Sequence, residues 1–399
     1  MSKKFAVIGL GSAGIQSIAH YLYYLPDNWT VTSISDPNIP ILGIGESTNP
    51  SFIATLESAT ELNLHDELKK GELNSTVKYG TLFSKWRDHE FINPLLGGSC
   101  ALHIDTFALK NFSLPKFKSK WKNKFEEIKG KVISITDKGS YVSIVIDDIE
   151  LTYDFVMDCR GIGTYDTDYT FLNNPTNHAL IHNVKEGSDL KLTGHTATYD
   201  GWMFTVPLKH RTSYGYLFNN KLTSIDQAKE NFSKQINVSI NELDKIEYKY
   251  SSYYANNIIN NRVCLNGTKA VFFEPMFANS LFIYEKINRL FFDLIFSNNF
   301  ANYKTINAAA IDSCKKTYAM IAYFYHGGST FNSPFWIRAS IDSKKVLNTT
   351  PYLNAYKKTI KKAHKEGFYP LGDDHWLFTT HGLEWIDRNL NYNYFQRDI

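Results

Sequence analysis

Three glycines near the start of the chain, Gly9, Gly11 and Gly14, have the GxGxxG spacing of a turn that holds a dinucleotide. The first glycine of such a turn permits a tight bend, the second lets a pyrophosphate approach the backbone, and the third allows close contact between strand and helix. Asp36 follows about 20 residues later, where a carboxylate can accept hydrogen bonds from a ribose hydroxyl. These residues predict a dinucleotide site, with a purely structural glycine turn as the alternative.

The elements around this turn agree with that interpretation. Residues 5–8 (FAVI) form a short apolar run before the glycines, and apolar residues then recur at helical spacing from Ile15 to Leu22. A second apolar run from Trp29 to Ile34 ends just before Asp36. Strand, turn, helix and strand follow in order, which predicts a βαβ unit with a right-handed connection.

A second nucleotide signal lies at residues 153–161, YDFVMDCRG. This apolar strand ends in Asp-x-x-Gly at Asp158 and Gly161, where a carboxylate would touch the ribityl or pyrophosphate region of a bound FAD. The glycine turn alone does not separate FAD from NAD, so this segment favours FAD. An ordinary strand end followed by a turn is the alternative.

The remaining patterns indicate a mixed α/β (α+β) protein. Period-two alternation over residues 132–135, 141–146 and 149–153 predicts an antiparallel meander, residues 201–217 are strand-like, and residues 281–295 and 308–325 are helical. We expect an FAD/NAD(P)-binding Rossmann-like lobe interleaved with an aromatic-rich substrate lobe in one unit, residues 1–399. The first lobe would comprise about 1–70, 95–170 and 255–300, and the second about 71–94, 171–254 and 301–399.

Composition points to a small-molecule partner. The chain has 399 residues, 43% hydrophobic, and its 43 Lys plus Arg nearly balance 40 Asp plus Glu, so no strong field favours nucleic acid or a membrane. The four cysteines form no CxxC pair, which indicates neither a zinc site nor a disulfide framework and suits a cytoplasmic protein. No export or membrane segment is evident, and a homodimer is left open as one oligomeric state.

Several further motifs, in order, resemble those of flavin-dependent halogenases of the tryptophan halogenase-like family. They are VTSISDPNIPILGIGESTNP at 31–50, Lys78 with Trp86 eight residues later, His-Ile-Asp at 103–105, Asp-Cys-x-Gly at 158–161, GWMFTVPLKHRTSYGY at 201–216 and STFNSPFWIR at 329–338. The 201–216 segment is similar to the family's WxWxIP signature, with Phe204 at the second tryptophan. The resemblance extends from residue 5 to about 340.

The resemblance implies a halogenase in which reduced FAD, delivered by a separate flavin reductase, acts with oxygen and a halide ion to make hypohalous acid. The acid then travels to Lys78 near a small, electron-rich aromatic substrate, where the amine holds or carries the oxidant. Outside this pattern a lysine would be interpreted as a surface residue. The implied cofactor-binding residues are Gly9, Gly11, Ser12, Ala13, Gly14, Asp36, Gly45, Glu46, Ser47, Thr48, Asp158, Gly161 and Pro275.

The resemblance also implies a substrate and oxidant tunnel and a halide site. The tunnel would be lined by Trp202, Phe204, Pro207, Phe277, His103, Phe335 and Trp336. Tryptophan halogenases carry a proton-accepting glutamate where this chain has Phe277, so at that position the chain is closer to the phenol and pyrrole type. Ala278, Asn279 and Ser280 stand where the family has small hydroxyl residues and glycine around the halide. An FAD-dependent monooxygenase or oxidase without halide use is therefore the alternative function.

Two other patterns have simpler explanations. Lysines alternate with aromatic residues over 116–125, which could bind nucleic acid but is more often a solvated edge. His178 and His182 would share one face of a helix as metal ligands, but no carboxylate cluster is near them in the sequence, so we predict no metal site.

Overall fold

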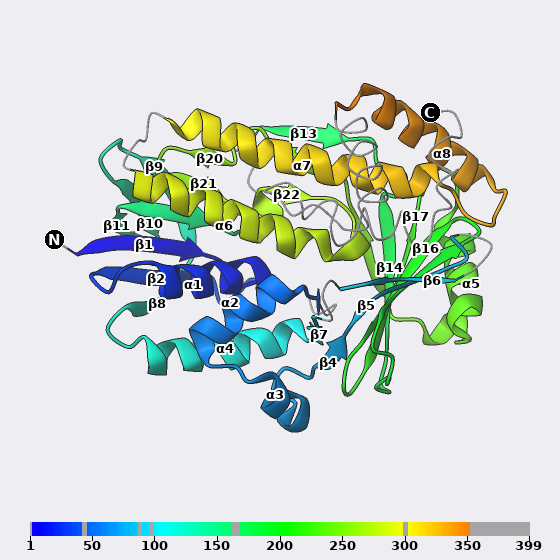
Figure 1. The fold of residues 1–399 in the computed structure, drawn as a ribbon, viewed down its shortest axis with the longest axis horizontal. Helices are drawn as coiled ribbons and strands as arrows, with labels where there is room; N and C mark the ends of the chain where they lie inside the picture. Colours follow the sequence, from blue (N-terminus) through cyan, green and yellow to red (C-terminus); the bar gives the residue numbers. More distant parts are fainter. Residues whose placement is uncertain are drawn as a thin grey trace, which may run out of the picture.

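The computed structural model describes residues 2–41, 46–86, 90–95, 99–161, 168–297 and 302–351. A six-stranded sheet forms one half of the molecule, on the left of Figure 1. Its strands lie in the order β20 (Ile259–Asn260), β21 (Val263–Leu265), β12 (Phe155–Asp158), β1 (Lys3–Ile8), β2 (Trp29–Ser35) and β8 (Phe125–Lys129). The strands from β21 to β8 are parallel, and only β20 pairs antiparallel. The mixed α/β class and the predicted strand, helix and strand at the N-terminus are confirmed.

Both faces of this sheet are covered, which explains the uninterrupted apolar run of β1. Phe5 and Val7 belong to the large core on the helical side, where Phe5 stacks on Tyr21 at a ring distance of 4.0 Å. Ala6 and Ile8 belong to a second cluster on the other side. The predicted meander makes that second cluster and is confirmed as an antiparallel sheet in the order β11 (Ile149–Tyr153), β10 (Val142–Ile146) and β9 (Val132–Asp137).

The helical side is made by segments far apart in the sequence. Figure 1 shows α1, α2 and α4 beside the first strands, with α6 next to α1 and α7 running along the molecule. The helices are α1 (Ser12–Tyr24), α2 (Pro50–Thr60), α3 (Leu64–Lys70), α4 (Thr106–Lys120), α5 (Ile225–Ile236), α6 (Asn279–Ser297), α7 (Tyr303–His326) and α8 (Pro334–Thr349), with short 3-10 turns η2 (Ile240–Glu242), η3 (Gly267–Lys269) and η4 (Met276–Ala278). The predicted helices near 281–295 and 308–325 are confirmed as α6 and α7. None of the helices in the described ranges is both long and apolar enough to span a membrane.

A seven-stranded sheet forms the other half, on the right of Figure 1. Its order is β18 (Ile246–Lys249), β14 (His178–Val184), β17 (Thr212–Phe218), β16 (Gly201–Pro207), β15 (Thr193–Thr198), β5 (Gly80–Ser84) and β6 (Phe91–Pro94), and a small sheet joins β13 (Tyr169–Leu172), β19 (Ser252–Ala255) and β22 (Val271–Phe272). Between the two large sheets lies a three-stranded sheet of β3 (Glu46–Ser47), β7 (Ala101–Ile104) and β4 (Thr76–Lys78), whose last two strands Figure 1 shows at the centre.

His178 and His182 lie on strand β14 and not on one face of a helix. The His178 ring contacts the carboxylate of Glu247 on β18 at 2.8 Å, and the His182 ring contacts that of Asp244 at 3.4 Å. Both rings therefore have carboxylate partners within the fold.

The first half of the lysine-rich run, predicted as a solvated edge, lies at the end of helix α4. Lys116 and Lys120 reach Glu72 and Glu61 at 3.8 and 3.3 Å, and Lys118 pairs with Glu127. Lys124 is buried, and its amine donates to the carbonyls of Leu22 and Leu25 at the end of α1. Carboxylates and helix-end carbonyls thus engage these four lysines.

Candidate functional site

Each glycine of the turn between β1 and α1 has its own structural reason. Gly9 has a φ of +100°, a conformation that favours glycine, and its N–H donates to the Ile34 carbonyl over 2.8 Å. A Cβ on Gly14 would lie 2.0 Å from the Gly9 carbonyl oxygen, so the helix packs on the turn at this residue. A Cβ on Gly11 would meet no atom of the described residues within 4 Å. Among those residues, space is therefore left at Gly11, as required where a phosphate lies against the backbone.

The start of α1 is built to receive an anion. Gly11 is the N-cap, and no side chain caps the helix, so the first-turn N–H groups and the positive end of the helix dipole point out of the turn. The turn lies between β1 and β12, where the strand order reverses direction, and open α/β sheets bind ligands at this point. Asp36 directly follows β2 on the same edge, and its carboxylate accepts the Asn38 N–H at 2.8 Å. The predicted residues Ser12, Ala13 and Gly14 form the first turn of α1 and fit a dinucleotide.

The second predicted nucleotide segment also lies on this edge. Asp158 ends β12, is 2% exposed, and pairs in register with Ile8. Its carboxylate is held by the Arg160 guanidinium in two hydrogen bonds of 3.0 and 2.9 Å. Gly161 follows, and a Cβ there would only touch Thr268 at 3.5 Å. The sequence predicted Asp158 at the end of a strand, as the structure has it, but did not reveal its ion pair.

The small central sheet connects the glycine turn with the predicted catalytic lysine. β7 pairs with β3 on one side and β4 on the other, so that Ser47 and Thr76 both lie opposite His103. At the end of β3 nearer the cofactor turn, Ser12 donates to Glu46 at 2.7 Å. Burial raises the pKa of the Glu46 carboxyl. Gly45, also predicted to bind the cofactor, lies outside the described residues.

Lys78 is the most deeply buried cation on this sheet. Its side chain is 1% exposed, and its amine donates to the Thr48 carbonyl at 2.8 Å. Burial lowers its pKa from 10.5 to about 7, so close to half of the amine is neutral near pH 7. Thr48 is itself fixed, because its hydroxyl donates to the Leu102 carbonyl at 2.6 Å. A lysine in this environment can act as a base or nucleophile at neutral pH.

His103 lies beside Lys78 in a chain of hydroxyl groups. Its Nδ1 contacts the Thr76 hydroxyl at 3.0 Å and its Nε2 the Thr193 hydroxyl at 2.9 Å, which in turn contacts Ser47 at 2.7 Å. Burial and then the neighbouring Lys78 lower the pKa of His103. Thr76 also donates to the carbonyl of Pro207, another predicted tunnel residue, at 2.6 Å. The ring is therefore neutral and fixed in orientation.

The predicted tunnel residues meet in a buried aromatic cluster next to this sheet. Trp202 and Phe204 project from the same side of β16, with ring centroids 6.5 Å apart, and both are buried. Trp336 contacts Trp86 at 5.1 Å and Phe335 at 5.2 Å, and Trp86 contacts Trp202 at 6.2 Å. The structure thus brings these four predicted aromatic residues into one cluster.

His195 is a member of this cluster that the sequence did not indicate. Its ring stacks on Trp202 at 4.8 Å and 17°, and its Nε2 accepts the backbone N–H of Phe277 at 3.3 Å. Trp202 is anchored at its other end, because its Nε1 donates to the Tyr325 hydroxyl at 2.9 Å and that hydroxyl donates to buried Glu274 at 2.7 Å. His195 and Phe277 are 82 positions apart in the sequence, and Trp202 and Tyr325 are 123 apart, so no local pattern could have shown these contacts.

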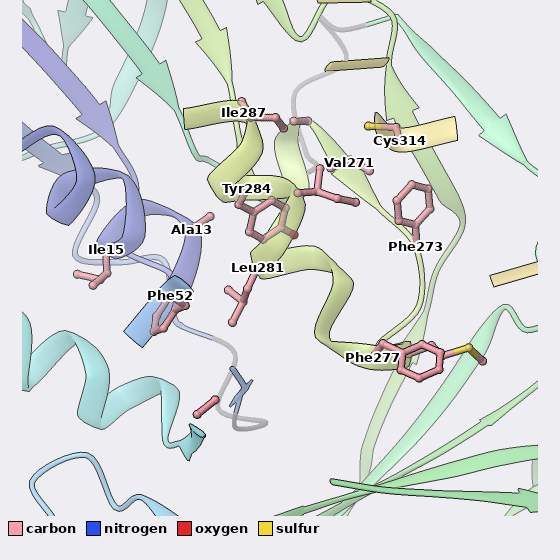
Figure 2. Close-up of a cluster of buried hydrophobic side chains, with 14 of the residues drawn as sticks. Ala13, Ile15, Phe52, Val271, Phe273, Phe277, Leu281, Tyr284, Ile287 and Cys314 are labelled. Atoms are coloured by element: carbon pink, nitrogen blue, oxygen red, sulfur yellow. The ribbon is translucent and has the colours of Figure 1, made fainter. Parts of the chain in front are cut away.

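Phe277 lies in the loop before α6 in a strained conformation. Its φ of +61° is rare for a residue with a side chain, and its ring contacts Phe324 at 4.3 Å and Phe83 at 5.0 Å. Figure 2 shows it apart from Leu281, Tyr284 and Ile287 of α6, on the loop that leads down from Phe273. Pro275 of the same loop is exposed. A phenyl ring here cannot accept a proton.

The predicted halide segment forms the start of α6. Ala278 ends η4 and Asn279 begins the helix, followed by Ser280. Asn279 is 2% exposed, and its amide nitrogen has no hydrogen-bond partner among the described residues. A buried donor at a helix N-terminus suits an anion.

Comparison with known proteins gives the family of the chain. The sequence profile of the tryptophan halogenase family matches residues 4–139 and 99–386. The chain therefore belongs to the tryptophan halogenase family, a family of flavin-dependent halogenases.

Solved structures with the same fold include a tryptophan halogenase from Shewanella frigidimarina NCIMB 400, with a TM-score of 0.79, 14% identity, and coverage of 99% of this chain and 89% of that one. A flavin-dependent halogenase from Xanthomonas campestris has a TM-score of 0.72, 17% identity, and coverage of 96% and 89%. A curated relative, the uncharacterised protein y4xG of Sinorhizobium fredii, is 25% identical over 152 residues, which is 36% of this chain and 30% of that protein's length.

Proposed function

We propose that this protein is an FAD-dependent halogenase that modifies a small, electron-rich aromatic compound. Reduced FAD, supplied by a separate reductase, would provide hypohalous acid from oxygen and a halide ion. The observation that carries the proposal is the environment of Lys78, a fully buried lysine whose pKa is about 7, two strands from the segment that contacts the flavin turn.

Lys78 would pass the halogen toward the substrate. With its amine partly neutral, the nitrogen lone pair can take the halogen of hypohalous acid and release water, giving a haloamine, or the amine can hold the acid by a hydrogen bond. The hydrogen bond to the Thr48 carbonyl fixes the position of Nζ, since that residue is itself bonded to β7. Protonation of Lys78 would remove the lone pair, so haloamine formation would increase as the pH rises through about 7.

Asn279 supports retained halide use. Its buried amide nitrogen, which lacks a partner in the described part of the chain, lies in the first turn of α6, where backbone N–H groups add a positive potential. An amide donor would replace the small hydroxyl group that the family carries nearby.

Phe277 restricts the substrates. Because it stands where tryptophan halogenases have a glutamate, the halogenated ring would have to lose its proton without help from that position. Rings already activated by a hydroxyl group or a pyrrole nitrogen meet this requirement. The His195 ring contacts Phe277 at 5.9 Å, but its Nε2 is engaged by the Phe277 N–H.

A monooxygenase or oxidase that has lost halide use is the second candidate. Its support is the phenyl ring of Phe277, packed against Phe83 and Phe324, directly before the proposed halide segment. In that case oxygen would still be consumed and the product would be hydroxylated or would be peroxide.

The test is to supply the pure protein with reduced FAD, oxygen and each halide in turn, with a panel of indoles and phenols. We expect halogenated phenols, and we expect Lys78→Ala to bind flavin and consume oxygen while losing roughly a hundredfold or more of carbon–halogen bond formation. Lys118→Ala, which removes a half-exposed lysine from α4, is the matched control and keeps parental activity. Equal halogenation by Lys78→Ala refutes the relay, and only hydroxylated product or peroxide from the parent with every halide favours the second candidate.

A further inference from the structure

Arg160 follows the end of β12, on the edge of the sheet where the glycine turn lies, and its guanidinium is held by several hydrogen bonds. Its Nε and Nη2 donate to the two carboxylate oxygens of Asp158 at 3.0 and 2.9 Å, and its backbone N–H donates to the same carboxylate at 3.0 Å. Its Nη1 donates to the Val132 carbonyl at 3.2 Å. The guanidinium plane is therefore fixed at three of its nitrogens.

The backbone just before this fixed guanidinium lies against the glycine turn. The N–H of Cys159 donates to the Ile8 carbonyl at 2.8 Å, and a Cβ on Gly9 would come within 2.9 Å of the Cys159 carbonyl oxygen, so the residue before Arg160 touches the turn. Nη1 of the guanidinium donates to the Val132 carbonyl. Gly130, two residues before Val132, donates its N–H to the carbonyl of Ser35 at the end of β2. Arg160 thus extends from the end of β12 toward the place where Asp36 follows β2.

The charges at this edge explain why an arginine is useful here. A dinucleotide brings two negative phosphates to the turn, and a bare Asp158 carboxylate on the adjacent strand would repel them. The guanidinium balances the negative charge of Asp158. Because the Arg160 side chain retains some exposure, it can also face a phosphate at this edge of the sheet. Arginine is suited to phosphates and can also stack on a planar base.

We propose that the Arg160 guanidinium, and not the Asp158 carboxylate, is the group on β12 that contacts the AMP half of FAD. Asp158 is then a positioning residue that holds the guanidinium. This inference rests on the proposed use of FAD. In it, Arg160 recognises the adenosine-side phosphate and ribose, and this recognition does not depend on halide chemistry.

The experiment measures dissociation constants for FAD, FMN and ADP in the absence of turnover, by titration calorimetry or flavin fluorescence. For Arg160→Ser we expect FAD and ADP affinity to fall about tenfold or more, the effect of losing a hydrogen bond to a charged group, while FMN affinity stays within about twofold. Equal losses for FAD and FMN, or no loss for FAD, would overturn the proposal.

Arg160→Ser also leaves a buried carboxylate without its cation, so a second variant separates binding from stability. The double change Asp158→Asn with Arg160→Ser removes both charges, and we expect it to restore stability while the loss of FAD affinity remains. Parental FAD affinity in the double variant would mean that Arg160 only neutralises Asp158, which refutes the contact.

Arg262→Ser is the matched control, because it removes the same charge from the opposite edge of the sheet. There Arg262 donates to the carbonyls of Asp154 and Gly139 at 3.0 and 2.6 Å, before β12 begins. We expect its ratio of FAD to FMN affinity to be unchanged. Failure of the parent to bind FAD would refute the proposed function together with this inference, whereas parental FAD binding that does not depend on Arg160 would refute this inference alone.

Discussion

Replacing Lys78 by methionine should stabilise the flavin-free protein, although the lysine is the proposed catalytic group. The pKa of Lys78 is about 7 in the folded protein and near 10.5 in the unfolded chain, so between these values the unfolded chain binds more protons. The free energy of unfolding therefore rises with pH from about 7 to 10.5. Below about pH 7 the folded protein carries the full free-energy cost of burying the charged amine. That cost is on the order of 5 kcal/mol, since each tenfold change in proton affinity is worth about 1.36 kcal/mol.

Lys78→Met removes this cost and keeps a side chain of similar length. It also removes the hydrogen bond to the Thr48 carbonyl, whose net contribution is about 1 kcal/mol. The variant should thus be more stable than the parent by roughly 3 kcal/mol at pH 6.5, and the advantage should shrink to about zero by pH 10.

Urea unfolding followed by tryptophan fluorescence, at several pH values from 6.5 to 10, measures this difference. Tyrosines with raised pKa values titrate in both proteins and cancel. Lys118→Met is the contrasting control, because that lysine is half-exposed and its replacement removes no deeply buried cation, so we expect no gain in stability at pH 6.5. If the difference in free energy of unfolding between Lys78→Met and the parent stays constant with pH, Lys78 is not a buried amine with a lowered pKa.

Other expectations follow from the same geometry. Gly11→Ala should leave the free energy of unfolding within about 1 kcal/mol of the parent and lose FAD in a binding titration. Gly14→Ala should lower the free energy of unfolding by about 1–3 kcal/mol or more, since its Cβ meets the Gly9 carbonyl. Equal stability of the two variants in denaturation would contradict this. Asn279→Ala should raise the KM for bromide severalfold with little change in flavin binding, and an unchanged halide KM would exclude the amide from the halide site. The parent should prefer phenols to free tryptophan, because Phe277 cannot accept a proton; a faster reaction with tryptophan in competition assays would show that another base acts there.

The sequence predicted the elements whose signals are local. The glycine turn, the apolar runs of β1 and β2, and the alternation of β9 to β11 each depend on a few adjacent residues, and each is found in the structure. The lysine run from 116 to 124 gave no local sign of the helix that ends within it, because Pro115 lies inside that helix. Its ion pairs with Glu61, Glu72 and Glu127 are tertiary contacts that no local pattern could predict.

The candidate site could be predicted only where a motif carried it. Lys78 was identified by its resemblance to a family pattern. The burial that lowers its pKa depends on the pairing of β4 with β7 and of β7 with β3, which lie far apart in the sequence. His195 and the Arg160 pairing have no sequence signal, because the first depends on contact with Trp202 and Phe277 across strands and a loop, and the second on where the β12 edge meets β9.

The three residues from Glu46 to Thr48 explain how a flavin turn and a distant lysine can act together. Glu46 accepts the Ser12 hydroxyl at the start of α1, Ser47 joins the hydroxyl chain to His103, and the Thr48 carbonyl accepts the Lys78 amine. Each contact is made by a different residue of one short extended segment, so a shift of one residue in the pairing of β3 with β7 would move all three at once. The spacing between the cofactor turn and the lysine is therefore set by the register of β3 on β7, and the proposed transfer of halogen depends on that register as much as on the lysine itself.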